Sequence, residues 1–72
     1  MKISPEQLDN WFTYHSPTPD QVLKYLAIRE GGRAFAECIV ENAPDGPDAT
    51  AAVRKVREAV MTANQAIACG GK

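Results

Sequence analysis

The stretch Thr18-Pro19-Asp20-Gln21 decides the fold, because it marks the start of the longest helix in the chain. Threonine is a favoured helix N-cap, and proline suits the first helical position because no backbone N–H is needed there. Glutamine three residues after the cap can return a hydrogen bond to the cap, which completes a capping box. The stretch Ser4-Pro5-Glu6-Gln7 repeats this pattern, so the sequence predicts two capped helices in succession.

The first predicted helix is short, about Pro5 to Phe12, with an apolar stripe at i, i+3 and i+4. This stripe consists of Leu8, Trp11 and Phe12. The second predicted helix is long, about Pro19 to Asn42, because apolar residues recur at helical spacing along it. Those residues are Val22, Tyr25, Leu26, Phe35, Ile39 and Val40.

A third helix is predicted from about Pro47 to Cys69, after a break at Pro44 and Gly46. Gly70-Gly71 ends it. Its expected buried seam consists of Ala49, Ala52, Val53, Val56, Ala59, Val60, Ala63 and Ile67. Two helices of about 35 Å joined by a short loop form an antiparallel hairpin. The predicted fold is therefore all-α, a single small domain over residues 1–72 in which a short helix precedes a long hairpin.

Some apolar residues fall outside the expected seam, namely Ile28, Cys38, Met61 and Ala66. Gly31-Gly32 also lies inside the second helix, where two glycines cost about 2 kcal/mol relative to two alanines. Two explanations for the glycine pair remain open. One is close approach of helices across a subunit contact, and the other is a ligand that needs room beside the backbone. A lone monomer looks incomplete in either case, so we expect a compact homo-oligomer.

Composition restricts the class of protein further. The chain has 72 residues, two cysteines and one histidine, and its formal net charge is −1. With no C-x-x-C motif, structural zinc is not expected, and we expect Cys38 and Cys69 to be buried apolar residues in a reducing cytosol. No signal peptide or membrane-spanning stretch is visible, so a soluble cytoplasmic protein is expected. The net charge argues against DNA or RNA as a partner.

Tyr14 and His15 lie in a proline-fixed connector between the first two helices. An aromatic side chain held there could stack on a nucleobase at little entropic cost. In the alternative interpretation, Tyr14 packs its ring over the start of the second helix and His15 is a solvated loop residue. Either interpretation fits the sequence.

Two pairs of arginines are spaced to share a helix face. Arg29 and Arg33 are four residues apart, and Arg54 and Arg57 are three apart. Such pairs can direct a fork of donors at phosphate groups. The alternative is a solvated surface on which Glu30, Glu37 and Glu58 serve as salt-bridge partners.

Catalysis is not expected. Cleavage of a phosphodiester needs a metal cluster or a pair of acid–base groups, and the chain has one histidine with acidic residues scattered over caps and surfaces. No nucleophile has a base in its vicinity, and no glycine-rich phosphate loop follows a strand. Binding without turnover is the better interpretation, with no metal and no cofactor.

Two blocks of sequence resemble a known family. The first is Phe12-Thr13-Tyr14-His15-Ser16-Pro17-Thr18-Pro19, followed by Tyr25, Ile28-Arg29-Glu30 and Phe35-Ala36. The second runs from Val53 to Ile67 and contains Arg57-Glu58-Ala59-Val60-Met61. Together they resemble the phage anti-CBASS cyclic-oligonucleotide sponge, whose domain is shared with the anti-Thoeris sponge. The resemblance covers about Phe12 to Ala68.

The resemblance implies an all-helical homo-hexamer that a virus makes in the cytosol of its bacterial host. Such a viral immune-evasion protein sequesters cyclic di- or trinucleotides such as 3′,3′-cyclic GMP-AMP (cGAMP), or cyclic ADP-ribose isomers, without cleaving them. By position, Tyr14 would stack on a base and Arg29 would contact phosphates between protomers, with His15 and Arg33 as weaker additions. Arg54 and Arg57 would serve a separate cyclic trinucleotide site. Gly31-Gly32 and the short linker from Pro44 to Pro47 depart from the family pattern, chiefly at this second site.

An alternative function is a small helical interaction module that docks on a host protein through its surplus apolar surface. It predicts that a host protein co-purifies and that loss of the Tyr14 ring leaves activity intact.

Overall fold

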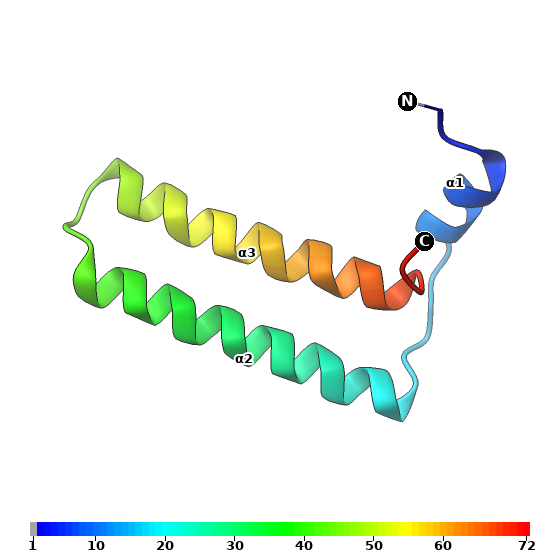
Figure 1. Cartoon of the computed structure of the whole chain (residues 1–72), viewed down its shortest axis with the longest axis horizontal. Helices are drawn as coiled ribbons and strands as arrows, with labels where there is room; N and C mark the ends of the chain where they lie inside the picture. Colours follow the sequence, from blue (N-terminus) through cyan, green and yellow to red (C-terminus); the bar gives the residue numbers. More distant parts are fainter. Residues whose placement is uncertain (1) are drawn as a thin grey trace.

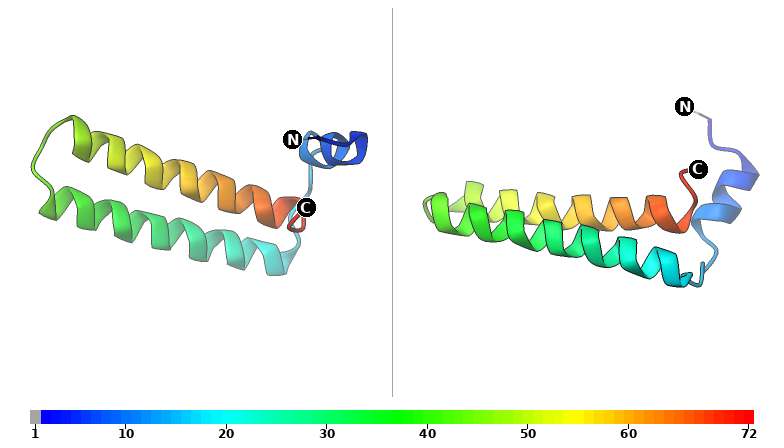
Figure 2. Two further views of the ribbon diagram at one scale, coloured as in Figure 1. Left: turned by 45° about the horizontal axis from the view of Figure 1, so that its top comes forward. Right: turned by 60° about the horizontal axis from the view of Figure 1, so that its bottom comes forward.

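The structure, a computed structural model, describes residues 2–72 as three helices. These are α1 (Pro5–Trp11), α2 (Pro19–Asn42) and α3 (Pro47–Ala68), and the described residues contain no strand. α2 and α3 lie side by side and antiparallel, while α1 sits at the end of the hairpin where α2 begins and α3 ends (Figure 1, Figure 2). The all-α fold and the helical hairpin predicted from the sequence are confirmed.

Both capping boxes form as the sequence predicts. The Gln21 backbone N–H donates to the Thr18 hydroxyl at 3.2 Å, and the Thr18 N–H donates to the Gln21 side-chain oxygen at 3.0 Å. Ser4 and Gln7 make the same two bonds at the start of α1, at 3.1 and 2.9 Å. These bonds satisfy N–H groups that have no partner inside the helix, so they fix where each helix begins.

The carboxyl end of α3 closes with a Schellman motif. Gly70 and Gly71 have φ of 66° and 77°, a left-handed conformation that glycine adopts without steric cost. The Gly71 N–H donates to the Ala66 carbonyl at 2.9 Å, and the Gly70 N–H donates to Ile67 at 3.2 Å. Cys69 is therefore the C-cap of α3, and Phe12 is the C-cap of α1, one residue beyond the observed end of each helix.

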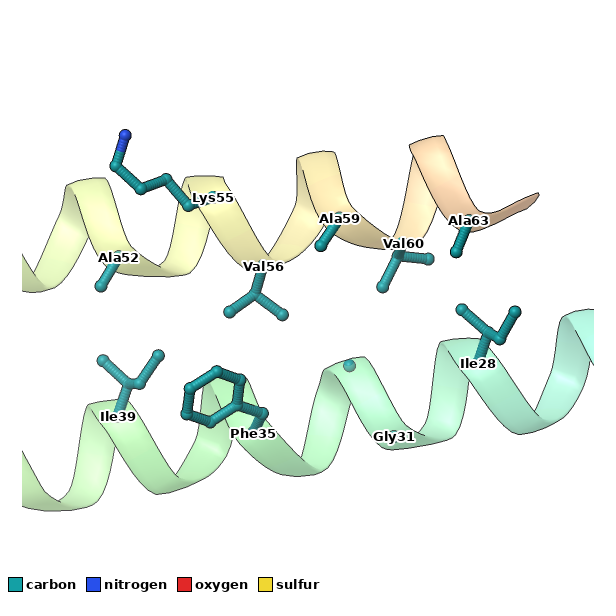
Figure 3. Close-up of a pocket in the computed structure, with 11 residues that line it drawn as sticks. Ile28, Gly31, Phe35, Ile39, Ala52, Lys55, Val56, Ala59, Val60 and Ala63 are labelled. Atoms are coloured by element: carbon teal, nitrogen blue, oxygen red, sulfur yellow. The ribbon is translucent and has the colours of Figure 1, made fainter. Parts of the chain in front are cut away.

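The seam of the hairpin runs along the facing surfaces of α2 and α3 (Figure 3). Ile28, Phe35 and Ile39 point from α2 toward Val56, Val60 and neighbouring alanines of α3. Ile28 thus belongs to this seam, although its spacing had placed it outside. The predicted seam of α3 is half-buried rather than buried, and Ala59 is exposed, because one helix alone covers only part of each side chain.

Gly32 marks the closest approach of the two helices. A methyl group at this position would collide with Cγ2 of Val60, whereas a methyl group at Gly31 would meet no atom within 4 Å. The close approach lies within one chain, so Gly32 needs no subunit contact to explain it. Both glycines line an open, largely apolar groove of about 560 Å³ between the helices.

Burial is shallow throughout the described residues. Cys69 is the one buried hydrophobic residue, with 7% of its surface exposed. Cys38, expected to be buried, is exposed, and it does not line the grooves between α2 and α3 that contain Gly32. Leu8 and Phe12 of the predicted α1 stripe are also exposed, since α1 meets the hairpin only at its end.

Replacement of each glycine in turn tests the helix approach. Gly32→Ala should destabilise the fold by about 1–3 kcal/mol, because β-branched Val60 cannot turn away cheaply. Gly31→Ala is the matched control and should be neutral or stabilising by about 0.5–1 kcal/mol through helix propensity. Thermal unfolding followed by circular dichroism should give a lower Tm for Gly32→Ala than for Gly31→Ala. Equal melting of the two variants would contradict the close approach.

Candidate functional site

Tyr14 projects from the connector between α1 and α2, and 83% of its surface is exposed. It does not pack over the start of α2, so the alternative interpretation of this side chain is wrong. Phe12, two residues earlier, is equally open at 84%. An exposed aromatic ring on a short, proline-bounded connector offers a flat face to a ligand with little loss of chain entropy.

His15 anchors this connector. Its Nε2 lies 2.7 Å from the backbone oxygen of Asn10. A carbonyl only accepts hydrogen bonds, so Nε2 carries the hydrogen and donates it. The hydroxyl of Thr13 also donates, to the backbone oxygen of Asp9. His15 is half-buried rather than a free loop residue, and it holds the connector that presents Tyr14.

Hydrogen bonds to the carboxyl end of α3 gather the other elements around it. The Asn10 side-chain amide donates to the Cys69 carbonyl at 3.1 Å, and the Trp11 indole N–H donates to the backbone oxygen of Lys72 at 3.4 Å. From α2, the Gln21 side-chain amide donates to the Ile67 carbonyl at 3.3 Å. These bonds add side-chain donors to carbonyls at and just beyond the end of α3, and they hold α1 against the hairpin.

Arg29, Arg33 and Arg57 line one groove between α2 and α3, with a volume of about 250 Å³. Its remaining lining is apolar and small: Gly32, Ala36, Val56, Val60 and Met61. The structure thus places Arg57 in the same groove as Arg29 and Arg33. The family resemblance had assigned Arg57 to a different site, together with Arg54. Helical spacing cannot reveal such a meeting, because it depends on the register of one helix against the other.

The three guanidinium groups of this groove differ in their partners. Arg33 Nε donates to a Glu37 carboxylate oxygen at 2.8 Å, as the alternative interpretation of a salt-bridged surface arginine predicted. This hydrogen bond and the charge of Glu37 raise the pKa of Arg33. Arg29 and Arg57 make no ion pair within residues 2–72. Among residues 2–72, two cations therefore line this groove without a direct ion-pair partner, an arrangement that suits an anionic ligand.

Arg54 lies in a neighbouring groove of about 460 Å³ near the α2–α3 turn, which Arg57 also lines. The acidic side chain of Asp45 is part of the same lining. The structure therefore brings Arg54 and Arg57 together as the sequence predicts, but places an acid beside them.

Tyr14 and Arg29 do not meet within one chain. Tyr14 precedes α2, and Arg29 comes ten residues after the first residue of that helix, roughly 15 Å along its axis. A ligand that touches both groups must span this distance, or take the two groups from different copies of the chain.

The described residues contain no group of three or more His, Cys, Asp and Glu side chains that could hold a metal ion. Within the same part of the chain, no helix is long and apolar enough to cross a membrane. What the site offers is an exposed aromatic ring, unpaired guanidinium groups and an apolar groove floor.

A comparison with protein families identifies the chain. The model of the Acb2/Tad1 hairpin domain matches residues 4–68, which include all three helices. The chain belongs to the Acb2/Tad1 family. This is the family of anti-CBASS and anti-Thoeris sponges, so the resemblance drawn from the two sequence blocks is confirmed. No curated protein and no solved structure matches the chain.

Membership of the Acb2/Tad1 family implies a general role as a cyclic nucleotide sponge, a binding protein rather than an enzyme. The matched span also includes α1 and the connector that carries Tyr14.

Asn10→Ala tests whether this tether positions α1. Loss of the bond to Cys69 should cost about 1 kcal/mol and loosen α1, with the connector that follows it. Trp11 is the only tryptophan, so its emission reports the docking directly. We expect a red shift and stronger quenching by acrylamide in Asn10→Ala. The control Asp9→Ala alters an exposed neighbour and should leave emission unchanged; equal spectra for both variants would refute the tether.

Proposed function

We propose that this protein binds and sequesters cyclic dinucleotide or trinucleotide second messengers of bacterial CBASS signalling, or both, without cleaving them. It would act as a viral immune-evasion protein in the cytosol of a bacterial host. Membership of the Acb2/Tad1 family over residues 4–68 is the observation that carries the proposal. The exposed connector ring and the unpaired arginines support it, because they supply the two kinds of contact that a cyclic nucleotide needs.

Tyr14 is proposed to stack on a nucleobase. Its ring is open to solvent, and His15 holds the connector on which it sits. Stacking of a base on an aromatic side chain contributes about 1–3 kcal/mol. Since the connector is anchored before the ligand arrives, little of this energy is lost to ordering the chain.

Arg29 is proposed to contact the phosphates, with Arg33 in support. Arg29 is free of ion pairs within residues 2–72, whereas Arg33 must first exchange Glu37 for the ligand. The Arg33–Glu37 pair is solvent-exposed, so the exchange faces little resistance. Arg54 and Arg57 remain candidates for a trinucleotide, although Asp45 in their shared groove opposes a phosphate there.

We further propose that the binding unit is a homo-oligomer. The family resemblance implies that this oligomer is a hexamer. The apolar groove that contains Phe35 and Ile39 is open in a single chain, and Phe35 is 60% exposed. A second copy laid over this groove would remove the apolar surface from water. It would also allow Tyr14 of one copy to approach Arg29 of another.

Sequestration without cleavage fits the acid–base groups that are present. His15 is the only histidine, and its Nε2–H is engaged by the Asn10 carbonyl. Hydrolysis of a phosphodiester needs a base to activate water and an acid for the leaving oxygen. A sponge instead depends on affinity and copy number, and nanomolar binding corresponds to about −12 kcal/mol.

Isothermal titration with 3′,3′-cGAMP tests the proposal. The unaltered protein should bind tightly, and chromatography after denaturation should recover the ligand intact. Tyr14→Ala should weaken binding by about 5- to 150-fold through lost stacking. Phe12→Ala is the matched control, an equally exposed ring two residues away, and should bind like the parent.

Two outcomes would contradict the proposal. One is absence of heat with 3′,3′-cGAMP, cyclic trinucleotides and cyclic ADP-ribose isomers alike. The other is recovery of linear nucleotide, which would indicate cleavage. Failure to bind any of these ligands, combined with a co-purifying host protein, would favour the protein-docking alternative.

A further inference from the structure

Tyr14 lies between two residues whose side chains both hydrogen-bond back to α1. The Thr13 hydroxyl donates to the backbone oxygen of Asp9. His15 Nε2–H donates to the backbone oxygen of Asn10 at 2.7 Å. Both carbonyls belong to the last turn of α1, where a helix leaves its carbonyls without internal partners. The connector is thus anchored on both sides of Tyr14, whose own ring stays in solvent.

Asn10 is the junction of this anchoring, because its backbone and its side chain are both engaged. Its backbone oxygen accepts from His15 and also, at 3.7 Å, from the thiol of Cys69. Its side-chain amide donates to the Cys69 carbonyl at 3.1 Å. Asn10 is half-buried and Cys69 is buried, so water competes little for these bonds. A continuous path of hydrogen bonds therefore runs from the end of α3 through Asn10 to the connector.

The turn that follows α3 gives this path a fixed starting point. The Schellman motif holds the backbone of the turn. The Gln65 side-chain amide donates to Cys69 Sγ at 3.2 Å. Trp11 of α1 makes a second contact with the turn, through the backbone oxygen of Lys72. Cys69 and Lys72 lie beyond residues 4–68, so this anchor is not part of the span that the family model matches.

We infer that Asn10 is a positioning residue for the proposed stacking ring: it fixes Tyr14 through His15, and it is itself fixed by Cys69. Neither Asn10 nor His15 then touches the ligand. A ring that is already held in place stacks on a base without first being ordered, so loss of the path lowers affinity although no ligand contact is removed. His15, which the resemblance placed among the ligand contacts, takes this supporting role instead. The inference rests on the proposed function, because it names residues that support the same site.

Titration of single variants with 3′,3′-cGAMP tests the positioning role. Asn10→Ala and His15→Ala should each weaken binding about 3- to 10-fold, because each removes one hydrogen bond of the path. His15→Gln should restore most of the affinity that His15→Ala loses, because a glutamine side-chain amide can also donate to the Asn10 carbonyl. Asp9→Ala is the matched control: it changes an exposed side chain, keeps the backbone oxygen, and should alter the Kd by less than about twofold.

A double-mutant cycle separates positioning from general stability. In the Tyr14→Ala background, Asn10→Ala should change the Kd by less than about twofold, because the ring that it positions is absent. A merely structural role would weaken binding by the same factor in both backgrounds. Circular dichroism and sedimentation check that each variant keeps the fold and assembly of the parent. If Asn10→Ala does not keep them, His15→Ala takes its place in the same cycle.

The possible failures are distinguishable. If the unaltered protein binds and Asn10→Ala binds equally well, the positioning role is wrong and the proposed function stands. Equal losses with and without the Tyr14 ring would also overturn it. A loss in His15→Gln as large as in His15→Ala would contradict it as well, because the imidazole itself would then contact the ligand. If the unaltered protein binds no cyclic nucleotide, the proposed function fails and the positioning role fails with it.

Discussion

In the described residues α2 and α3 pack along one seam, and Gly32 against Val60 limits how closely the two helices can approach there. Two antiparallel helices cover one stripe of each other and leave their remaining surfaces open. Along the hairpin no hydrophobic residue is buried, and Phe35, Val40 and Met61 are largely exposed; Cys69, beside α1 at the end of α3, is the one buried hydrophobic residue among residues 2–72. A chain of this size needs additional burial to be stable, and no disulfide or metal cluster supplies it within the described residues.

The shallow burial of the hairpin connects the fold to the proposed activity. If further copies cover this open surface, as we propose, side chains of different copies come together and a ligand site can form from groups that are far apart in one chain. Tyr14 at the end of the hairpin and Arg29 in the middle of α2 are such groups. In the proposed oligomer, assembly together with the Asn10 tether would order these elements before the ligand arrives, so that binding energy is retained as affinity. A binder that does not turn over depends on this pre-organisation.

The sequence allows the local structure to be predicted well. Capping boxes at Ser4 and Thr18 and the glycine pair after α3 act within a few residues, so their patterns can be read directly. Helical periodicity likewise predicts the three helices and the hairpin. The family can also be recognised from the sequence, because the block that begins at Phe12 and the block from Val53 to Ile67 occur together and in order.

Features that depend on the register between helices could not be predicted. The seam position of Ile28, the exposure of Cys38 and the fit of Gly32 against Val60 follow from how α2 is rotated against α3. The meeting of Arg29 with Arg57 has the same origin. The tether of α1 to the end of α3 joins residues 59 positions apart, and nothing in the local pattern around Asn10 signals it.

Native mass spectrometry during titration with 3′,3′-cGAMP tests the central claim, that copies of this chain assemble and share ligand sites. It reports the number of chains and the number of bound ligands in the same species. The account predicts an oligomer, with a hexamer as the proposed form, that carries fewer ligands than chains and loses none of its subunits on saturation. A monomer that binds one ligand, or an oligomer with one ligand confined to each chain, would contradict it.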